Sequence, residues 1–235
     1  MKMDPPLLRA KFLCRYKRFL ADVALPNGEL LTVHCPNTGR MTRCLVEGSP
    51  CFLWDSNNPK RKYRYSLELV TTACGHLAGV NTLRANQLIS EALLESRLPE
   101  LQGYTQILSE QRYGAEKSRI DFLLRSENES CFIEVKSVTL ALEHRCGFFP
   151  DAVSARASKH LRELIAVRRA GHRAVLVYCV QHTGIDSVAP ASHVDPTYGQ
   201  NLRAAVAAGV EVLAYRVVLS GYELIVGGRV SVVLE

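Results

Sequence analysis

The sequence has no apolar run long enough to cross a bilayer as a helix, which excludes a chain built on transmembrane helices. Its amino terminus, MKMDPPLLRAKF, has no long apolar stretch behind the first lysine, so it lacks the pattern of a secretory signal. It also has no internal repeat and no low-complexity linker. These absences predict a cytoplasmic protein that does not contact a membrane and whose parts pack tightly together.

Metal-binding cysteine patterns are also missing. The chain has 8 cysteines, but none forms a Cys-x-x-Cys pair, and no His-x-x-x-His accompanies them. Without an export signal, a disulfide framework is not expected either. The sequence therefore predicts that most of these thiols are small, reduced core residues.

The positive charge is confined to one part of the chain. The 235 residues carry a net charge of +6 and are 47% hydrophobic, which is typical of a soluble protein with one large domain or two small ones. Residues 1–81 hold 12 lysines and arginines against 6 acids, whereas residues 82–235 hold 17 of each. This asymmetry favours a polyanion-binding module at the amino terminus over a merely solvated basic surface.

Residues 1–81 have the pattern of a small all-β domain. Five short runs rich in β-branched and aromatic residues alternate with turn sequences such as Pro-Asn-Gly and DSNNPK. The expected strands are 18–25, 30–35, 50–54, 63–70 and 76–80. Strands of this number and length fit a small barrel or sandwich, and a barrel of the oligonucleotide-binding type is a natural candidate.

Two clusters combine cations with aromatic residues inside this segment. Such mixtures suit surfaces that follow a phosphate backbone and stack bases, although charged edge strands also prevent aggregation. We predict that these residues bind DNA, with RNA as the alternative. The candidates are Arg15, Lys17 and Arg18 around Tyr16, and Lys60, Arg61, Lys62 and Arg64 around Tyr63.

Residues 82–235 change to an α/β pattern. Helical periodicity runs over 81–98, 154–169 and 199–208, and Gly171 ends the second helix. Strands are expected at 106–113, 118–125 and 131–138 in antiparallel succession, then at 173–180 and 210–218. The sequence thus predicts a second domain, 82–235, with a central mixed sheet and helices.

The hairpin 118–138 carries charges among its apolar residues. A two-residue turn at Glu127–Asn128 would place Asp121 directly opposite Glu134, with Cβ atoms about 5 Å apart, and Lys136 on the same side. The other side would then be wholly apolar, made of Ile120, Phe122, Ile133 and Val135. One face of the hairpin is expected to build a core and the other to gather charges.

Two facing carboxylates repel each other unless a proton or a cation lies between them. Mg²⁺ or Mn²⁺ bound by Asp121 and Glu134 would remove the repulsion, and Lys136 could orient a water or stabilise charge on a phosphate. Glu91, on the preceding helix, could supply a third carboxylate, with Glu95 as the alternative. A plain Glu134–Lys136 surface ion pair is the competing interpretation.

Seven segments make the chain resemble the sugar fermentation stimulation protein A family of bacteria and archaea. They run in one order from end to end: RYKRFLADV, HCPNTGRM, KRKYRYSLELV, GVNTLRAN, YGAEKSRIDFLL, IEVKSVTL and FPDAV…KHLREL. The chain departs from the family at Arg43, where we expect glycine.

The resemblance implies an oligonucleotide-binding (OB) type barrel followed by a domain similar to PD-(D/E)xK nucleases. In that motif the first acid falls on Asp121, the second on Glu134, the lysine on Lys136 and the helix acid on Glu91; Ile120 replaces the proline. The family is described as DNA-binding, and its name records a regulatory role in sugar (maltose) metabolism.

Two functions follow as hypotheses. The first is a metal-dependent nuclease, and the second is a DNA-binding regulator of sugar genes whose nuclease-like domain no longer cuts. On the helix 154–169, Lys159 or His160 could reach a substrate phosphate, but we favour a solvated helix face for His160. The sequence indicates no oligomeric state.

Overall fold

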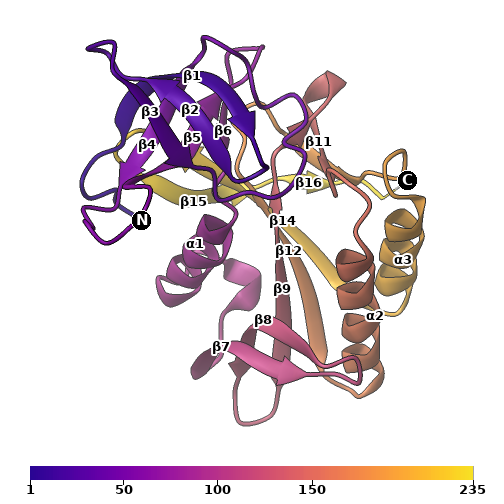
Figure 1. Ribbon diagram of the computed structural model, residues 1–235. Helices are drawn as coiled ribbons and strands as arrows, with labels where there is room; N and C mark the ends of the chain where they lie inside the picture. The colour runs from indigo at the N-terminus through magenta and orange to yellow at the C-terminus, as the bar shows by residue number, and fades with distance from the viewer. Residues whose placement is uncertain (235) are drawn as a thin grey trace.

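Six short strands form the first third of the chain in the computed structural model, which describes residues 1–234 apart from the side chain of Glu143. Their order is β3-β2-β1-β4-β5-β6, and a pairing of His34 with Ser66 joins β3 to β5. This pairing closes β1–β5 into a barrel, as predicted (Figure 1). The strands are β1 (Leu8–Tyr16), β2 (Leu20–Ala24), β3 (Leu30–His34), β4 (Pro50–Asp55), β5 (Tyr65–Thr71) and β6 (Leu77–Gly79).

The strand β1 was not among the five expected from the sequence. Its residues alternate, with Ala10 and Phe12 buried in the barrel and Arg9 and Lys11 exposed. This alternation is hard to recognise in the sequence because the segment is short and rich in charged residues. The fifth predicted strand, β6, lies outside the closed barrel. It pairs with β5 on one side and forms a β-bridge from Ala78 to His182 on the other.

The loop after β3 contains the expected departure from the family. Arg43 is exposed and has φ of 62°, in the left-handed region. Because glycine adopts this conformation without steric cost, a glycine is the residue that the loop would accommodate best, and Arg43 holds the same backbone shape at some cost.

The rest of the chain forms a mixed sheet covered by helices on both faces. Its order is β15-β14-β12-β9-β8-β7, in which β9, β12 and β14 run parallel and the outer pairs antiparallel. The elements are α1 (Leu83–Leu94), β7 (Gln106–Tyr113), β8 (Ser118–Arg125), β9 (Ser130–Val138), α2 (Ala155–Arg169), β12 (Arg173–Val180), α3 (Pro196–Ala207), β14 (Glu211–Leu219) and β15 (Leu224–Arg229).

Shorter elements complete the domain. A small sheet of order β10-β11-β13-β16 lies beside the barrel, at the end of the main sheet (Figure 1). The short elements are the 3-10 turns Pro99–Leu101 and Glu143–Arg145 and the strands β10 (Leu140–Ala141), β11 (Cys146–Phe149), β13 (Ser187–Pro190) and β16 (Ser231–Val232). The predicted boundary at 81/82 falls between β6 and α1, and the predicted end at residue 235 lies outside the described residues.

Two apolar cores hold the helices to the sheet. Leu88 and Ile89 of α1 are fully buried in the core on one face, while Leu161, Leu164 and Leu202 of α2 and α3 belong to the core on the other. In Figure 1, α1 and the pair α2–α3 accordingly flank the sheet on opposite sides. No helix within residues 1–234 combines the length and apolarity needed to span a bilayer.

The ends of α2 follow the sequence signals. The Ser154 hydroxyl caps the helix by accepting a hydrogen bond from Ala157 N at 3.1 Å, and Gly171 follows the last turn with φ of 86°. All 8 cysteines are free thiols, and five of them are buried.

The turn between β7 and β8 is hydrogen-bonded to α2. The buried carboxylate of Glu163 accepts a hydrogen bond from Glu116 N at 2.7 Å, and Lys159 donates to Glu116 O at 2.6 Å. Gly114 opens this turn with φ of 71°, and a Cβ placed there would lie 1.9 Å from Glu163 Oε2. Only a residue without a side chain fits between the turn and the helix.

We therefore expect Gly114→Ala to lower the free energy of unfolding by about 2–4 kcal/mol, because it combines backbone strain with a clash against a buried carboxylate. Urea unfolding measures the change. Gly28→Ala is the matched control: it also has positive φ, at 87°, but nothing lies within 4 Å of its Cβ position. Equal losses in the two variants would contradict the proposed clash.

Candidate active site

The hairpin β8–β9 has the predicted register. The pairs run from Arg125↔Ser130 to Phe122↔Ile133, and Ser126 N donates to Glu129 O at 2.9 Å to close the turn. Counted on by one residue, this register would pair Asp121 with Glu134, but the ladder ends at Phe122↔Ile133. The ladder stops there because Val135 N donates to Asp121 Oδ2, at 2.7 Å, and not to a backbone carbonyl.

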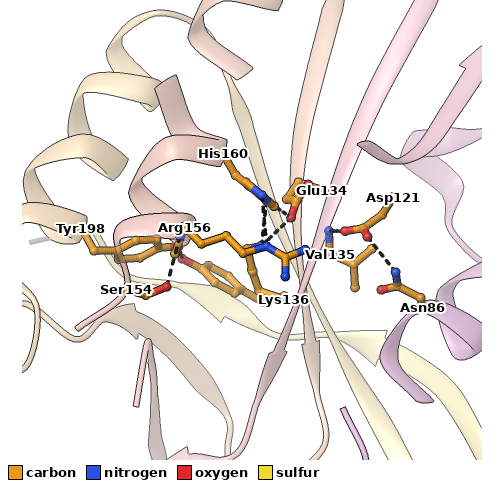
Figure 2. A network of polar contacts seen from close by, with 11 residues as sticks. Asn86, Asp121, Glu134, Val135, Lys136, Ser154, Arg156, His160 and Tyr198 are labelled. Carbon is orange, nitrogen blue, oxygen red and sulfur yellow. Dashed lines mark hydrogen bonds and ion pairs between the residues drawn. The ribbon is translucent and has the colours of Figure 1, made fainter. Parts of the chain in front are cut away.

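The predicted division of the hairpin into an apolar and a charged face is wrong. Phe122 and Val135 pack into the core beneath α1, but Ile120 packs into the core beneath α2. Both faces are buried because helices cover both sides of the sheet. The carboxylates of Asp121 and Glu134 consequently turn to different partners, as Figure 2 shows.

Asp121 is held toward α1. Its Oδ1 atom accepts a hydrogen bond from Asn86 Nδ2 at 2.7 Å, while Oδ2 binds Val135 N. Burial and the negative charge of Glu134 raise the pKa of Asp121 to about 6, against the effect of the Val135 N–H, the Lys136 charge and the Asn86 amide. The negative charge of Glu134 therefore acts on Asp121, although the two carboxylates turn to different helices.

Glu134 is held toward α2, with only 2% of its surface exposed. Its Oε1 atom makes close contacts with Lys136 Nζ and His160 Nδ1. Burial favours the neutral acid, but the hydrogen bond from His160 and the charge of Lys136 outweigh it, so the pKa of Glu134 lies below its usual value. Its other oxygen, Oε2, is buried without a hydrogen-bond partner in the described part of the chain.

His160 belongs to the same cluster, so its interpretation as part of a solvated helix face is wrong. It is 5% exposed, and its Nδ1 atom lies 3.2 Å from Lys136 Nζ. Arg156 Nε approaches Nε2 at 3.5 Å. An imidazole protonated at Nδ1 can donate to Glu134 and accept from Arg156, which assigns its tautomer. The helical spacing of His160 from buried Ala157 and Leu164 was the sequence signal for its burial.

Glu91 lies apart from this cluster. Its carboxylate is paired with the Met1 ammonium at 2.5 Å and with Arg97 at 3.7 Å. It lines the same groove as Asp121, of about 500 Å³, and Glu95 lines that groove as well. Within residues 1–234, no three His, Cys, Asp or Glu side chains come close enough together to hold a metal ion. The structure thus brings Asp121, Glu134 and Lys136 together and leaves Glu91 on the groove wall.

A second groove, of about 470 Å³, lies between the barrel and the α/β domain. Lys136 lines it together with Arg18 from the barrel, and Asn86 lines both this interdomain groove and the Asp121 groove. A chain that passes from one groove to the other across Asn86 would meet Lys136 and Asp121 in turn.

The barrel and the α/β domain are joined along the interdomain groove. Asp151 Oδ2 accepts a hydrogen bond from Met41 N at 3.1 Å, and a Cβ on Gly39 would lie 2.7 Å from that same oxygen. The Pro-Asn-Thr-Gly turn and the segment FPDAV, far apart in sequence, therefore contact each other.

The two basic clusters of the barrel have different environments. Arg15 donates to the backbone carbonyls of Arg18, Asn37 and Gly39, and so supports the turn beside the interdomain groove. Arg64 makes a two-point ion pair with Asp55. The exposed members of the clusters are Lys17, Arg18, Lys60, Lys62 and Arg64.

Three arginines and lysines of the second cluster lie near aromatic rings. Arg61 is 6.0 Å from the Trp54 ring centroid, Lys62 is 5.5 Å from that of Tyr63, and Arg64 is 5.3 Å from that of Tyr65. Sequence reasoning noticed the tyrosines but overlooked Trp54, which precedes the basic run by several residues.

Comparisons with known proteins cover the whole chain. The family model of the sugar fermentation stimulation protein RE domain matches residues 83–223, and that of the SfsA N-terminal OB domain matches residues 13–80. Sugar fermentation stimulation protein homologs of Teredinibacter turnerae and Saccharophagus degradans are 59% identical over 234 residues and 60% identical over 217 residues. The first alignment covers 100% of both chains, and the second covers 92% of this chain and 93% of the relative.

A solved structure shares the complete fold. The structure of Pyrococcus furiosus SfsA in complex with Ca²⁺ superposes with a TM-score of 0.86 and 30% sequence identity. The match covers 99% of each chain. The barrel, the mixed sheet and their connection are therefore common to both proteins.

Proposed function

The chain belongs to the sugar fermentation stimulation protein A family, and we propose that it is a metal-dependent nuclease that holds nucleic acid on its barrel. The observation that carries the proposal is the coupled pair Asp121 and Glu134 beside Lys136, where one carboxylate has a raised pKa and the other a lowered one. Pairs of acids whose pKa values are pushed apart are typical of sites that perform acid–base or metal chemistry.

The residues fit a hard divalent cation. Asp121 and the unpartnered Oε2 atom of Glu134 would hold Mg²⁺ or Mn²⁺, since such ions take one or two carboxylates and keep water and phosphate oxygens as their other ligands. When bound, the cation would neutralise both carboxylates and polarise the scissile phosphate. The Pyrococcus furiosus protein was solved in complex with Ca²⁺, which supports the binding of a divalent cation by a protein of this fold.

The side chains of the site have separate tasks in this proposal. The Lys136 ammonium, whose side chain is 13% exposed, orients the attacking water and stabilises the charge that develops on the phosphate. His160 is a positioning residue, because it contacts both Glu134 and Lys136 from α2. Asn86 fixes the Asp121 carboxylate at the edge shared by the two grooves.

A second function, a DNA-binding regulator of sugar (maltose) genes that does not cut, has one observation in its favour. Protein groups already bind both oxygens of Asp121 and the Oε1 atom of Glu134. Because these oxygens already have hydrogen-bond or ion-pair partners, the site would be stable without a cation and could serve as a scaffold.

A cleavage assay with labelled single- and double-stranded DNA and RNA distinguishes the nuclease from the non-cutting regulator. The nuclease is expected to cut at least one of the four substrates with Mg²⁺ or Mn²⁺ and to stop when EDTA is added. Binding of a substrate without cleavage of any would overturn the nuclease and favour the regulator. Cleavage that EDTA leaves unchanged would also overturn it.

The contribution of the barrel to nucleic-acid binding is tested separately. Replacing Lys60, Arg61 and Lys62 by alanine removes three positive charges from one loop. We expect weaker nucleic-acid binding and a plot of log affinity against log salt concentration whose slope is smaller by about 2–3, because each phosphate contact releases about one counterion. Fluorescence anisotropy at several salt concentrations measures this. An unchanged slope would move the binding surface elsewhere.

A further inference from the structure

A small pocket lies where the barrel meets α1, next to the Asp121 groove. Its volume is about 200 Å³, below the roughly 300–1,000 Å³ of pockets for drug-sized ligands. It therefore fits one flat ring system but not a whole nucleotide. The residues that line it include His34, Trp54, Arg61, Leu83, Arg84 and Gln87.

Trp54, on β4, is the only tryptophan of the chain and is partly buried against the core beneath α1. The Arg84 guanidinium lies 5.2 Å from its ring centroid and donates to both oxygens of Glu68, at 3.0 and 3.1 Å. Glu68 is 1% exposed. Because a buried ion pair adds little to stability, its main effect here is to fix the arginine and the ring before any ligand arrives.

Arg61 approaches the same ring from the loop between β4 and β5, with its guanidinium carbon 6.0 Å from the centroid. A base held between the two groups at normal stacking distances of about 3.4 Å needs about 6.8 Å. The 6.0 Å distance between the Arg61 guanidinium carbon and the ring centroid is close to this spacing, so a small movement of Arg61 admits a base. Among residues 1–234 its guanidinium makes no hydrogen bond that opposes this movement.

The pocket shares one lining residue with the Asp121 groove. Gln87 lines both the pocket and the Asp121 groove, one turn of α1 from Leu83, which is 68% exposed at the pocket rim. Exposed Lys60 and Lys62 flank Arg61 on its loop and can pair with phosphates. A base inside a duplex is stacked between its neighbours and cannot enter such a pocket, whereas a single strand offers its bases freely.

We propose that this Trp54 pocket takes one unstacked base of a single-stranded nucleic acid whose backbone continues past Gln87 to Asp121. The pocket thereby selects single strands, or duplex ends that open, as the substrate of the site. The backbone path beyond Gln87 rests on the proposed nuclease function; the base pocket itself does not.

Because Trp54 is the sole tryptophan, its fluorescence reports directly on the pocket. The wild-type protein in EDTA is titrated with an oligothymidylate of about 12 nucleotides, within the span of one barrel of this type, with a duplex of the same length and with thymidine monophosphate. We expect saturable quenching by the single strand at concentrations where the duplex and the mononucleotide cause none. Quenching by all three alike, or by none, overturns the proposal.

Variants complete the test by anisotropy with the same oligothymidylate. Trp54→Ala is expected to weaken binding by about 5- to 150-fold, the range for one lost base stack, while Trp54→Phe keeps a ring in place and most of the affinity. Tyr222→Ala removes an aromatic side chain that is 73% exposed and lines neither the pocket nor the Asp121 groove, so it serves as the control. Equal binding by all three variants and wild type overturns the proposal.

The two proposals can fail separately. Saturable quenching by single strands in a protein that cleaves no substrate would overturn the nuclease and leave the base pocket in place. Metal-dependent cleavage with no change in Trp54 fluorescence on binding would leave the nuclease in place and overturn the pocket.

Discussion

Lys136→Ala is expected to lower the rate of metal-dependent cleavage by about 100- to 1,000-fold, the usual effect of removing one positioned donor to a developing negative charge. The ammonium is in close contact with Glu134, and it borders the interdomain groove, which shares Asn86 with the Asp121 groove that takes the substrate. Nucleic-acid affinity in EDTA should change little, because the proposed binding residues lie on the barrel. Single-turnover cleavage and anisotropy measure the two effects.

Three further variants are needed to interpret the Lys136→Ala result. Lys136→Met keeps most of the side-chain packing, so equal losses in both variants assign the effect to the charge. Lys136→Arg keeps the charge but changes its shape, and it should restore little activity. Lys11→Ala, an exposed lysine of β1 outside both basic clusters, is the matched control. Wild-type rates in Lys136→Ala, with folding verified by circular dichroism, would contradict the proposed role.

The sequence predicted the hairpin register because its determinants are local. A polar two-residue turn fixes which residues face each other, and each later pair follows by counting, so the pairs from Arg125↔Ser130 to Phe122↔Ile133 needed no long-range information. The predicted pair Asp121–Glu134, one step further, is not part of the ladder. The helix ends at Ser154 and Gly171 were equally local, since capping depends on a few neighbouring residues.

The orientation of the side chains depends on long-range contacts, so it could not be predicted completely. Alternation assigns residues to two faces but cannot say what covers each face, so the burial of both faces by α1 and α2 was not foreseen. The partners of Asp121 and Glu134, namely Asn86 and His160, come from those helices. Only the tertiary arrangement brings them to the hairpin.

The prediction of the barrel was also limited by contacts between residues far apart in sequence. The barrel has five strands, as predicted, but β1 was missed because it mixes charged and apolar residues, and β6 was counted in its place. The closure of the barrel depends on the pairing of His34 with Ser66, which lie 32 positions apart. The Trp54 pocket depends on Arg84, which stands beyond the barrel at the start of α1. A scan for cations adjacent to aromatic residues in sequence could not find that contact.

Asp121→Asn is expected to stabilise the metal-free protein at neutral pH. Folding raises the pKa of Asp121 from 3.8 to about 6, so the folded state binds its proton more tightly than the unfolded state does. The stability that this group contributes is complete below about pH 4, is lost as the pH rises through 6, and leaves an ionised carboxylate that costs about 2–3 kcal/mol at pH 7.5. The amide carries no charge and avoids this cost. A poorer hydrogen bond to Asn86 offsets part of the gain in stability.

Urea unfolding in EDTA should therefore show Asp121→Asn more stable than wild type by about 1–2 kcal/mol at pH 7.5, with a difference that shrinks toward pH 4. Added Mn²⁺ should reverse the order: at 100 times its dissociation constant it stabilises wild type by about 2.7 kcal/mol and the variant little, since the variant lacks one of two carboxylate ligands. Glu127→Gln, at the exposed tip of the same hairpin, should follow wild type throughout. Equal stabilisation of Asp121→Asn and wild type by Mn²⁺ would exclude Asp121 as a ligand, whatever the pH dependence shows.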